Sequence, residues 1–253
     1  MSGGWKYAAA SVIGTSHQKS PEGVCQYSHA VRYLGHASAL IGIVSDGAGS
    51  ASHAHVGSRL TCNVIIGEAE RAQPAHLFTP AFARDTIEKV RGALFDEADK
   101  EGLEIRDFAC TMLVAIVSAD QSSFWQVGDG AICIRQAESE IYSCIYWPEK
   151  GDYANVTCFV TDVRAQEEAQ ISVYPEGFDE VALFTDGIER LALDFVAKEA
   201  YSKFFGGLFP HMRSMPEGYS EGLAKQIEGF LGSERVNQRT DDDKTLILAS
   251  RAS

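Results

Sequence analysis

Acidic residues stand shortly after apolar runs at three distant places in the chain. Asp46, Asp129 and Asp186 each follow a short run rich in Val, Ile, Leu or Phe, and each is followed by glycine. A further acidic group, 241–243, lies just before the apolar run 245–249. If these positions meet in the fold, several carboxylates share a small volume, which is unfavourable unless a cation neutralises them. Oxygen-only ligands select hard cations such as Mg²⁺, Mn²⁺ or Ca²⁺ rather than zinc.

Each acidic motif taken alone has a structural explanation. Asp-Gly is a common turn, and Gly-Asp-Gly at 128–130 would form a hairpin between two strands. The recurrence of an acid beside an apolar run at distant places favours a shared site over a series of unrelated turns. An EF-hand is excluded, because no stretch has its Asp-x-Asp-x-Asp-Gly ladder with a distal Glu.

Sequence motifs of other kinds of binding or catalytic site are incomplete or absent. Gly-Ala-Gly at 47–49 suggests a dinucleotide-binding turn, but Ser52 replaces its third glycine and Asp46 would repel pyrophosphate. An NAD-dependent oxidoreductase is therefore only a third hypothesis, to be tested by NAD(H) binding. The chain has no Gly-Lys of a P-loop and no Gly-x-Ser-x-Gly elbow of a serine hydrolase. His53 and His55 point to different faces of the helix expected there, so they do not predict a zinc site.

Short apolar or alternating runs predict a protein dominated by strands. The expected strands are 6–13, 39–44, 111–117, 124–127, 131–134, 141–146, 157–161, 180–184 and 245–249. Periodic apolar residues predict helices over 56–64, 87–94 and 223–230, the first capped by Ser50 or Ser52, the second ending before Gly102 and the third at Gly232. Because strands and helices do not alternate regularly, the order favours an α+β sandwich of two mostly antiparallel sheets flanked by helices. We expect residues 1–253 to form a single domain.

Composition limits the partners. The 253 residues include 22 Lys and Arg against 35 Asp and Glu, giving a net charge of −13, and 45% are hydrophobic, as in globular proteins. Such acidity disfavours nucleic acid and anionic membrane surfaces. No run approaches the roughly 18 apolar residues of a membrane span, and the first residues are too weakly apolar for a signal peptide. Six scattered cysteines without a CxxC pair indicate a reducing compartment, so we expect a cytoplasmic protein.

The order and spacing of these motifs resemble those of the protein phosphatase 2C family, the metal-dependent Ser/Thr phosphatases. The matching segments are Ser-Asp-Gly-Ala-Gly (45–49), Ala-Cys-Thr (109–111), Gly-Asp-Gly (128–130), Thr-Asp-Gly (185–187) and Asp-Asp-Lys-Thr (242–245). Segments 14–26 and 155–162 are similar to the short bacterial branch, and the resemblance extends over residues 12–249. It implies two antiparallel sheets with helices outside and a two-metal site at one edge.

The resemblance also assigns roles to single residues. Asp46 would bridge two metals and the carbonyl of Gly47 would bind one of them, while Asp186 and Asp242 would complete the other. Asp243, next to Asp242, is left in the turn or at the rim of the site. Two cations held a few ångströms apart activate a water and clamp phosphoryl oxygens.

Asp129 would support this site or hold a third ion. The implied cofactors are two Mn²⁺ or Mg²⁺ ions, and the implied activity is hydrolysis of phosphoserine and phosphothreonine in proteins by a metal-activated water. The expected partner is a phosphorylated protein, either a bacterial Ser/Thr kinase or its targets.

Two features depart from the family pattern. Cys25, Gln26 and Tyr27 stand where the bacterial branch usually has Cys-Gln-Asp, so no carboxylate is present there and we expect the second metal to bind weakly, unless Tyr27 packs elsewhere and Glu22 substitutes. Ala48 stands where many members have a His that donates a proton to the leaving group, and His17 is the nearest candidate for that catalytic role, a surface histidine being the alternative reading. The departures favour a second hypothesis, a weak or inactive phosphatase-like module that binds a metal or a phosphorylated partner.

Overall fold

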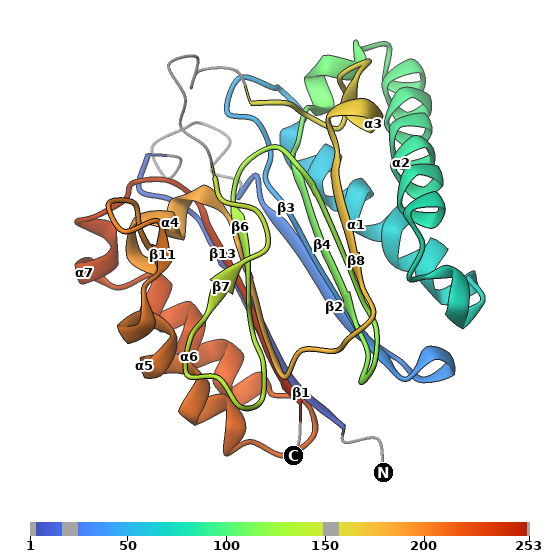
Figure 1. The fold of residues 1–253 in the computed structure, drawn as a ribbon. Helices are drawn as coiled ribbons and strands as arrows, with labels where there is room; N and C mark the ends of the chain where they lie inside the picture. The colour runs from blue at the N-terminus through green and yellow to red at the C-terminus, as the bar shows by residue number, and fades with distance from the viewer. Residues whose placement is uncertain (1–3, 17–24, 149–156, 252–253) are drawn as a thin grey trace.

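The computed structural model describes residues 4–16, 25–148 and 157–251, which form two facing β-sheets with helices on the outer surface of each (Figure 1). The strands are β1 (Trp5–Val12), β2 (Ser28–Leu34), β3 (Ala39–Ser45), β4 (Met112–Val117), β5 (Ser122–Val127), β6 (Ala131–Arg135), β7 (Ser143–Cys144), β8 (Gln170–Tyr174), β9 (Glu180–Phe184), β10 (Leu193–Asp194), β11 (Glu199–Ala200), β12 (Gly218–Tyr219) and β13 (Lys244–Arg251). The helices are α1 (Ala54–Arg71), α2 (Pro80–Glu101), α3 (Ala165–Glu168), α4 (Asp186–Ala192), α5 (Ser202–Arg213), α6 (Glu221–Leu231) and α7 (Glu234–Asn237). Short 3-10 helices cover Gly35–Ala37, Pro74–His76 and Ile105–Phe108.

Both sheets are almost entirely antiparallel. The six-stranded sheet has the order β12-β1-β13-β9-β6-β7, and the five-stranded sheet has the order β2-β3-β4-β5-β8. Only the short pairing of β12 with β1 is parallel among the described strands, and β10 and β11 form a separate hairpin. The predicted α+β sandwich is confirmed.

Three apolar clusters hold the layers together. One lies between the sheets and joins Val44 and Phe124 of the five-stranded sheet to Leu183 and Ile247 of the six-stranded sheet. A second joins the five-stranded sheet to α1 and α2, and a third joins the six-stranded sheet to α4, α5 and α6 (Figure 1). The central strands are therefore covered on both faces, which explains why their sequences are continuous apolar runs rather than alternating ones.

Strand prediction succeeded where both faces are covered. Every residue of β3 and β9 is buried, and β9 coincides with the predicted strand 180–184. The half-exposed strands β2 and β8 were not predicted, because β2 has one buried residue, Leu34, and β8 has none, so neither forms an apolar run. The predicted strand 157–161 is wrong, since these residues form a loop and a turn, and β7 keeps only the middle of the predicted 141–146.

The three predicted helices are confirmed as α1, α2 and α6. Gly102 closes α2 in the left-handed conformation, with a φ of 69°, and Gly232 is the C-terminal cap of α6. The predicted capping of α1 is wrong. His53 is its N-cap residue and makes no side-chain cap bond, while the Ser52 hydroxyl donates to Asp107 at 3.2 Å.

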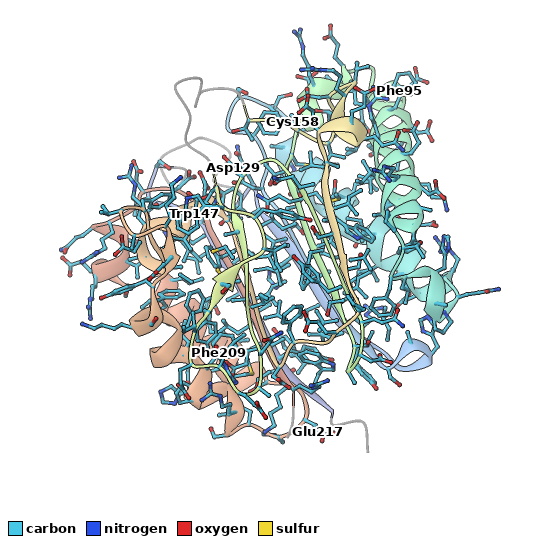
Figure 2. The ribbon with its side chains drawn as sticks, in the orientation of Figure 1. Phe95, Asp129, Trp147, Cys158, Phe209 and Glu217 are labelled. Atoms are coloured by element: carbon cyan, nitrogen blue, oxygen red, sulfur yellow. The ribbon has the colours of Figure 1, made fainter. Side chains whose placement is uncertain are left out.

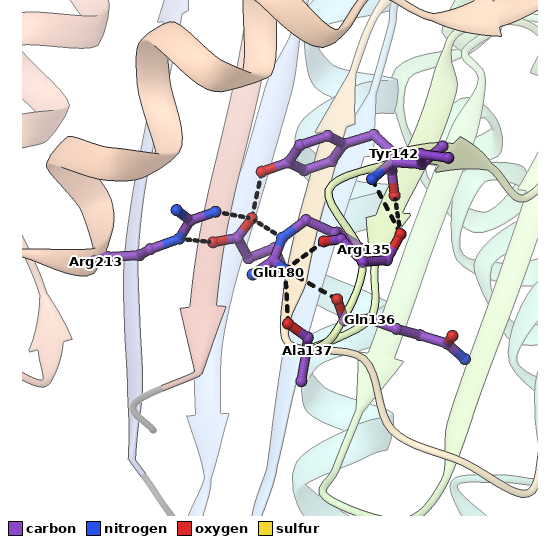
Figure 3. A network of polar contacts seen from close by, with 8 residues as sticks. Arg135, Gln136, Ala137, Tyr142, Glu180 and Arg213 are labelled. Carbon is purple, nitrogen blue, oxygen red and sulfur yellow. Dashed lines mark hydrogen bonds and ion pairs between the residues drawn. The ribbon is translucent and has the colours of Figure 1, made fainter.

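A buried ion pair fixes the register of β6 and β9. Glu180 is fully buried and lies opposite Arg135 in the ladder, and Arg135 Nε donates to its carboxylate at 2.6 Å. Arg213 of α5 donates to the same carboxylate at 2.5 Å and Tyr142 donates to it from the other side (Figure 3). A one-residue slip would turn every side chain to the other face and separate these partners.

Hydrogen bonding decides the charge state of Glu180. Burial alone would raise its pKa, but hydrogen bonds from Arg213, Arg135 and Tyr142 outweigh burial, so the pKa lies below its ordinary value. The stabilisation is therefore fully present above the pKa of an unfolded glutamate, about 4.3, and is lost as the pH falls further.

We expect Glu180→Gln to lower the free energy of unfolding by about 3 kcal/mol, because it leaves Arg135 beside a neutral amide. Urea unfolding measures this loss. Glu176→Gln is the matched control, since Glu176 is exposed and its change should stay within about 0.5 kcal/mol. Equal effects of the two substitutions would contradict the register role of Glu180.

Candidate metal centre

Hydrogen bonds between the Asp46 backbone and Thr111 hold Asp46 at the end of β3. The Asp46 amide donates to Thr111 Oγ1 at 3.1 Å, and the Thr111 amide donates to the Asp46 carbonyl at 2.7 Å. The Ser45 hydroxyl adds a third bond to the Thr111 carbonyl at 2.7 Å. Gly47 continues this pairing as an isolated bridge to Cys110. The segment 109–111 therefore positions Asp46 and Gly47, although its sequence contains no acid.

A tight turn between β5 and β6 carries Asp129. The flanking residues Gly128 and Gly130 have φ values of 90° and 91°, which only glycine adopts without strain. Gln126 Nε2 donates to the carbonyls of both glycines, at 3.1 and 3.2 Å, and the Gly130 amide donates to the buried Glu189 at 3.2 Å. Thus two buried side chains fix the backbone on either side of Asp129.

Asp186 begins α4, separated from the end of β9 only by the N-cap residue Thr185. A Cβ on the next residue, Gly187, would lie 2.2 Å from the carbonyl oxygen of Asp243, so only glycine lets the start of α4 pack against the segment that carries Asp242. The glycine that follows Asp186 is therefore required by the close approach of protein backbone.

The adjacent residues Asp242 and Asp243 have different roles. Asp242 lines the cavity described below, whereas Asp243 is fully buried. The Asp243 carboxylate accepts the Gly14 amide at 2.6 Å and the Gln26 amide at 2.8 Å. The expectation that Asp243 lies at the rim or only in the turn is wrong: it ties the N-terminal segment to the C-terminal one.

These segments meet at one end of the sandwich, where they enclose a cavity of about 330 Å³. Asp46, Gly47, Asp129, Asp186 and Asp242, all predicted site residues, line it. Figure 2 shows Asp129 at this end, with Glu217 at the opposite end of the molecule. The other residues that line the cavity are Ser16, Tyr27, Ala48, Gly49, Thr111, Thr157, Phe159 and Asp241. His17, the candidate proton donor, lies outside the described residues, as does Glu22.

The cavity concentrates negative charge. Burial, followed by repulsion from Asp186, Asp129 and Asp242, raises the pKa of Asp46 well above its usual range. Burial, followed by repulsion from Asp129 and Asp242, raises the pKa of Asp186 to about 7. Both carboxyls thus lower their free energy by taking up a proton, and a bound cation removes the same penalty.

The donor set fits a hydrated hard cation. Among the described residues, no three His, Cys, Asp or Glu side chains are arranged to hold an ion by themselves. Mg²⁺ keeps several water ligands and uses one or two carboxylates, so the spread of four acids around an open cavity suits it better than a closed cage. The donors are oxygen atoms, as hard cations require.

Tyr27 faces this cluster. Its side chain is 8% exposed and lines the cavity, and its hydroxyl donates to Asp186 Oδ1 at 3.4 Å. Burial, followed by repulsion from Asp46 and Asp186, raises the pKa of Tyr27 far above its usual range, so the phenol is a neutral donor. The alternative that Tyr27 packs elsewhere is therefore wrong.

Sequence reasoning missed several residues of the centre. Asp241 lines the cavity beside Asp242, and Thr111, Gln126 and Glu189 hold the acidic segments in place. The signal for Glu189 was its spacing, because a residue three positions after Asp186 shares its face when the segment is helical. Gln126 carried no signal that distinguishes it from other strand residues.

Comparisons with known proteins agree with this geometry. The sequence model of the family described as protein phosphatase 2C matches residues 13–231. The chain is 34% identical over 251 residues to serine/threonine-protein phosphatase 3 of Escherichia coli (strain K12), covering 97% of this chain and 98% of that relative. The chain belongs to the protein phosphatase 2C family.

Solved structures share the fold at low sequence identity. Serine/threonine phosphatase Stp1 from Staphylococcus aureus has a TM-score of 0.67 at 14% identity, covering 100% of this chain and 98% of that one. The catalytic domain of serine threonine protein phosphatase PstP, in complex with two manganese ions, has a TM-score of 0.66 at 14% identity, covering 99% of each chain. In the described part of this chain, no helix is long and apolar enough to cross a membrane.

The raised pKa of Asp186 predicts how stability depends on pH. An acid with a raised pKa contributes stability below its unfolded pKa, about 4, and loses that contribution as the pH rises through its folded pKa of about 7. We therefore expect the melting temperature in EDTA to fall between pH 5 and pH 7.5. Asp186→Asn should flatten this dependence and added Mn²⁺ should oppose it, whereas the exposed control Asp96→Asn should leave it unchanged. An unchanged slope in Asp186→Asn would contradict the assignment.

The two neighbouring acids predict opposite phenotypes. Asp243→Asn should lower the free energy of unfolding by about 1–3 kcal/mol, because an amide cannot accept both backbone bonds. Asp242→Asn should weaken Mn²⁺ binding and leave stability nearly unchanged, since its amide oxygen can still accept the Asp243 amide. Urea unfolding and calorimetric Mn²⁺ titration of both variants separate the effects. Weakened Mn²⁺ binding in Asp243→Asn without loss of stability would mean that the register is wrong by one residue.

Proposed function

We propose that this chain is a metal-dependent protein serine/threonine phosphatase that hydrolyses phosphoserine and phosphothreonine. One observation carries the proposal: Asp46, Asp129, Asp186 and Asp242, from four distant segments, line one cavity. The named family and the E. coli relative, a serine/threonine-protein phosphatase, support the same activity.

We propose a separate role for each residue of the cavity. Asp46 would serve both cations, the carbonyl of Gly47 would hold one of them, and Asp186 and Asp242 would hold the other. Asp129 supports the centre or holds a third ion. When bound, the cations supply an activated water and neutralise the phosphoryl oxygens. The carboxylates themselves would hold the cations in place, and His17 is the candidate to protonate the leaving serine or threonine oxygen.

We propose Mn²⁺ or Mg²⁺ as the cofactor. Oxygen ligands favour both ions, and the related PstP catalytic domain is described in complex with two manganese ions. The partners would be phosphorylated proteins, a Ser/Thr kinase or its targets, in the cytoplasm, with no binding of nucleic acid or membrane. We also propose that residues 1–253 act as one domain, because strands from β1 to β13 contribute to the cluster between the sheets.

A weak or inactive binding module is less well supported. An inactive module would not need to retain all four acids in one cavity, where burial and repulsion act on Asp46 and Asp186. The oxidoreductase hypothesis rested only on the glycines of segment 47–49. That segment lies within the match to the phosphatase family, so its glycines no longer favour a dinucleotide-binding turn.

The activity itself is the first test. We expect hydrolysis of p-nitrophenyl phosphate and of a phosphothreonine peptide when Mn²⁺ is present, and none in excess chelator. Asp46→Asn should lower kcat by about 10²-fold or more, because a neutral amide bridges cations poorly. The exposed control Asp96→Asn should retain full activity. Equal turnover in chelator would refute the metal mechanism, and no turnover with any divalent ion would favour the binding module.

Tyr27 sets the expected affinity of the second cation. A neutral phenol binds hard cations far less well than a carboxylate, and this one engages Asp186. We therefore expect one well-held Mn²⁺ and one that leaves on dialysis. Tyr27→Asp should tighten the second ion and raise activity at low Mn²⁺, whereas Tyr27→Phe, which adds no charge, should not. Calorimetric titration would contradict this idea if wild type held two equally tight ions and Tyr27→Asp changed neither.

A further inference from the structure

Two thiols of the six-stranded sheet face each other across neighbouring strands. Cys133 of β6 is paired with Cys144 of β7, and their sulfur atoms lie 3.0 Å apart. Both are free cysteines. The pair lies on the far side of the sheet from the inter-sheet core, in the cluster that contains Phe205 and Phe209 of α5, and none of the cavity residues belongs to it.

The backbone register suits a covalent bond. The amide of Ile145 donates to the carbonyl of Ile132 at 2.8 Å, so residues 132 and 145 form a hydrogen-bonded pair of the antiparallel ladder. The next pair, Cys133 and Cys144, is then a non-hydrogen-bonded one, where Cα atoms are about 4.5 Å apart and side chains approach most closely. That separation lies within the range of about 4.4–6.8 Å found across disulfides.

We propose that Cys133 and Cys144 are a modification site, which oxidants of the peroxide class convert to a reversible disulfide that staples the edge strand β7 to β6. Only a movement of about 1 Å separates the present sulfur contact from an S–S bond of about 2.0 Å. The proposal is independent of the phosphatase activity, because the pair contributes nothing to the cavity.

The exposure of the two thiols sets the order of events. Cys144 is half-buried on the outermost strand of the sheet, whereas Cys133 is fully buried. The Cys144 sulfur attacks the peroxide, forming an S–O bond as the O–O bond breaks and one water leaves. The Cys133 sulfur then attacks the Cys144 sulfur; the S–S bond forms, the S–O bond breaks, and the Cys133 proton leaves with the hydroxide as a second water. Two electrons pass from the thiols to the peroxide.

The test uses the full chain in EDTA, treated with graded hydrogen peroxide, then alkylated and digested with trypsin without reduction. Because trypsin cuts after Arg135, the two cysteines fall in separate peptides. We expect these peptides to be joined as the main product, with the loss of two hydrogens, and to separate on reduction. The oxidised protein should melt about 5 °C higher than the reduced one, because the link restricts the unfolded chain.

Three variants complete the test. Cys144→Ser and Cys133→Ala should each abolish both the joined peptides and the rise in melting temperature, whereas Cys158→Ser, at another half-buried cysteine, should keep both. Joined peptides in the wild type support the proposal even where a variant folds poorly. Oxidation of Cys144 to sulfinic acid without joining, or joining to a different cysteine, would overturn it. So would joining that proceeds equally fast in urea, because the native register would then play no part.

Discussion

Mutual repulsion among carboxylates is the constraint on which this structure depends. Asp46, Asp129, Asp186 and Asp242 line one cavity, and the raised pKa values of Asp46 and Asp186 show that the protein holds them together against their charge. The free energy needed to do so comes from elsewhere in the fold, chiefly from the three apolar clusters of the layered sandwich. The three apolar clusters that stabilise the fold therefore include none of the residues that line the acidic cavity.

The acids stay in place because the backbone beside each one is bonded to another segment. Thr111 holds the chain at Asp46, and Gln126 holds the turn at Asp129. The carboxylate of Asp243 accepts hydrogen bonds from the backbone amides of Gly14 and Gln26. At the end of β9 that lies away from the cavity, about 13 Å along the strand from Phe184, Glu180 prevents β6 and β9 from sliding past each other. Repulsion thus acts on side chains whose main chain cannot relax.

The sequence was informative where local pattern and burial coincide. The strand 180–184 and the acids at strand ends could be predicted, because a strand covered on both faces is a continuous apolar run and its end is marked by polar residues. The edge strand β8 could not be predicted, because none of its residues is buried and its sequence therefore shows no apolar run. The buried bonds of Asp243, and the pairing of Cys133 with Cys144, depend on register and on contacts between distant segments, which no local pattern encodes.

The same repulsion makes cation binding part of the folding equilibrium. A ligand that binds only the native state stabilises it by RT ln(1 + [L]/Kd), so a tightly held ion raises stability at low concentration and a weak one does not. Tyr27, a neutral donor to Asp186, leaves the cavity with one carboxylate fewer than an acid at that position would give. If the two proposed cations bind with unequal affinity, stability reports chiefly on the tight ion, whereas catalysis, which would need both, follows the weak one. Stability and activity would then rise at different cation concentrations in this chain, and substituting an acid for Tyr27 would bring the two concentrations together.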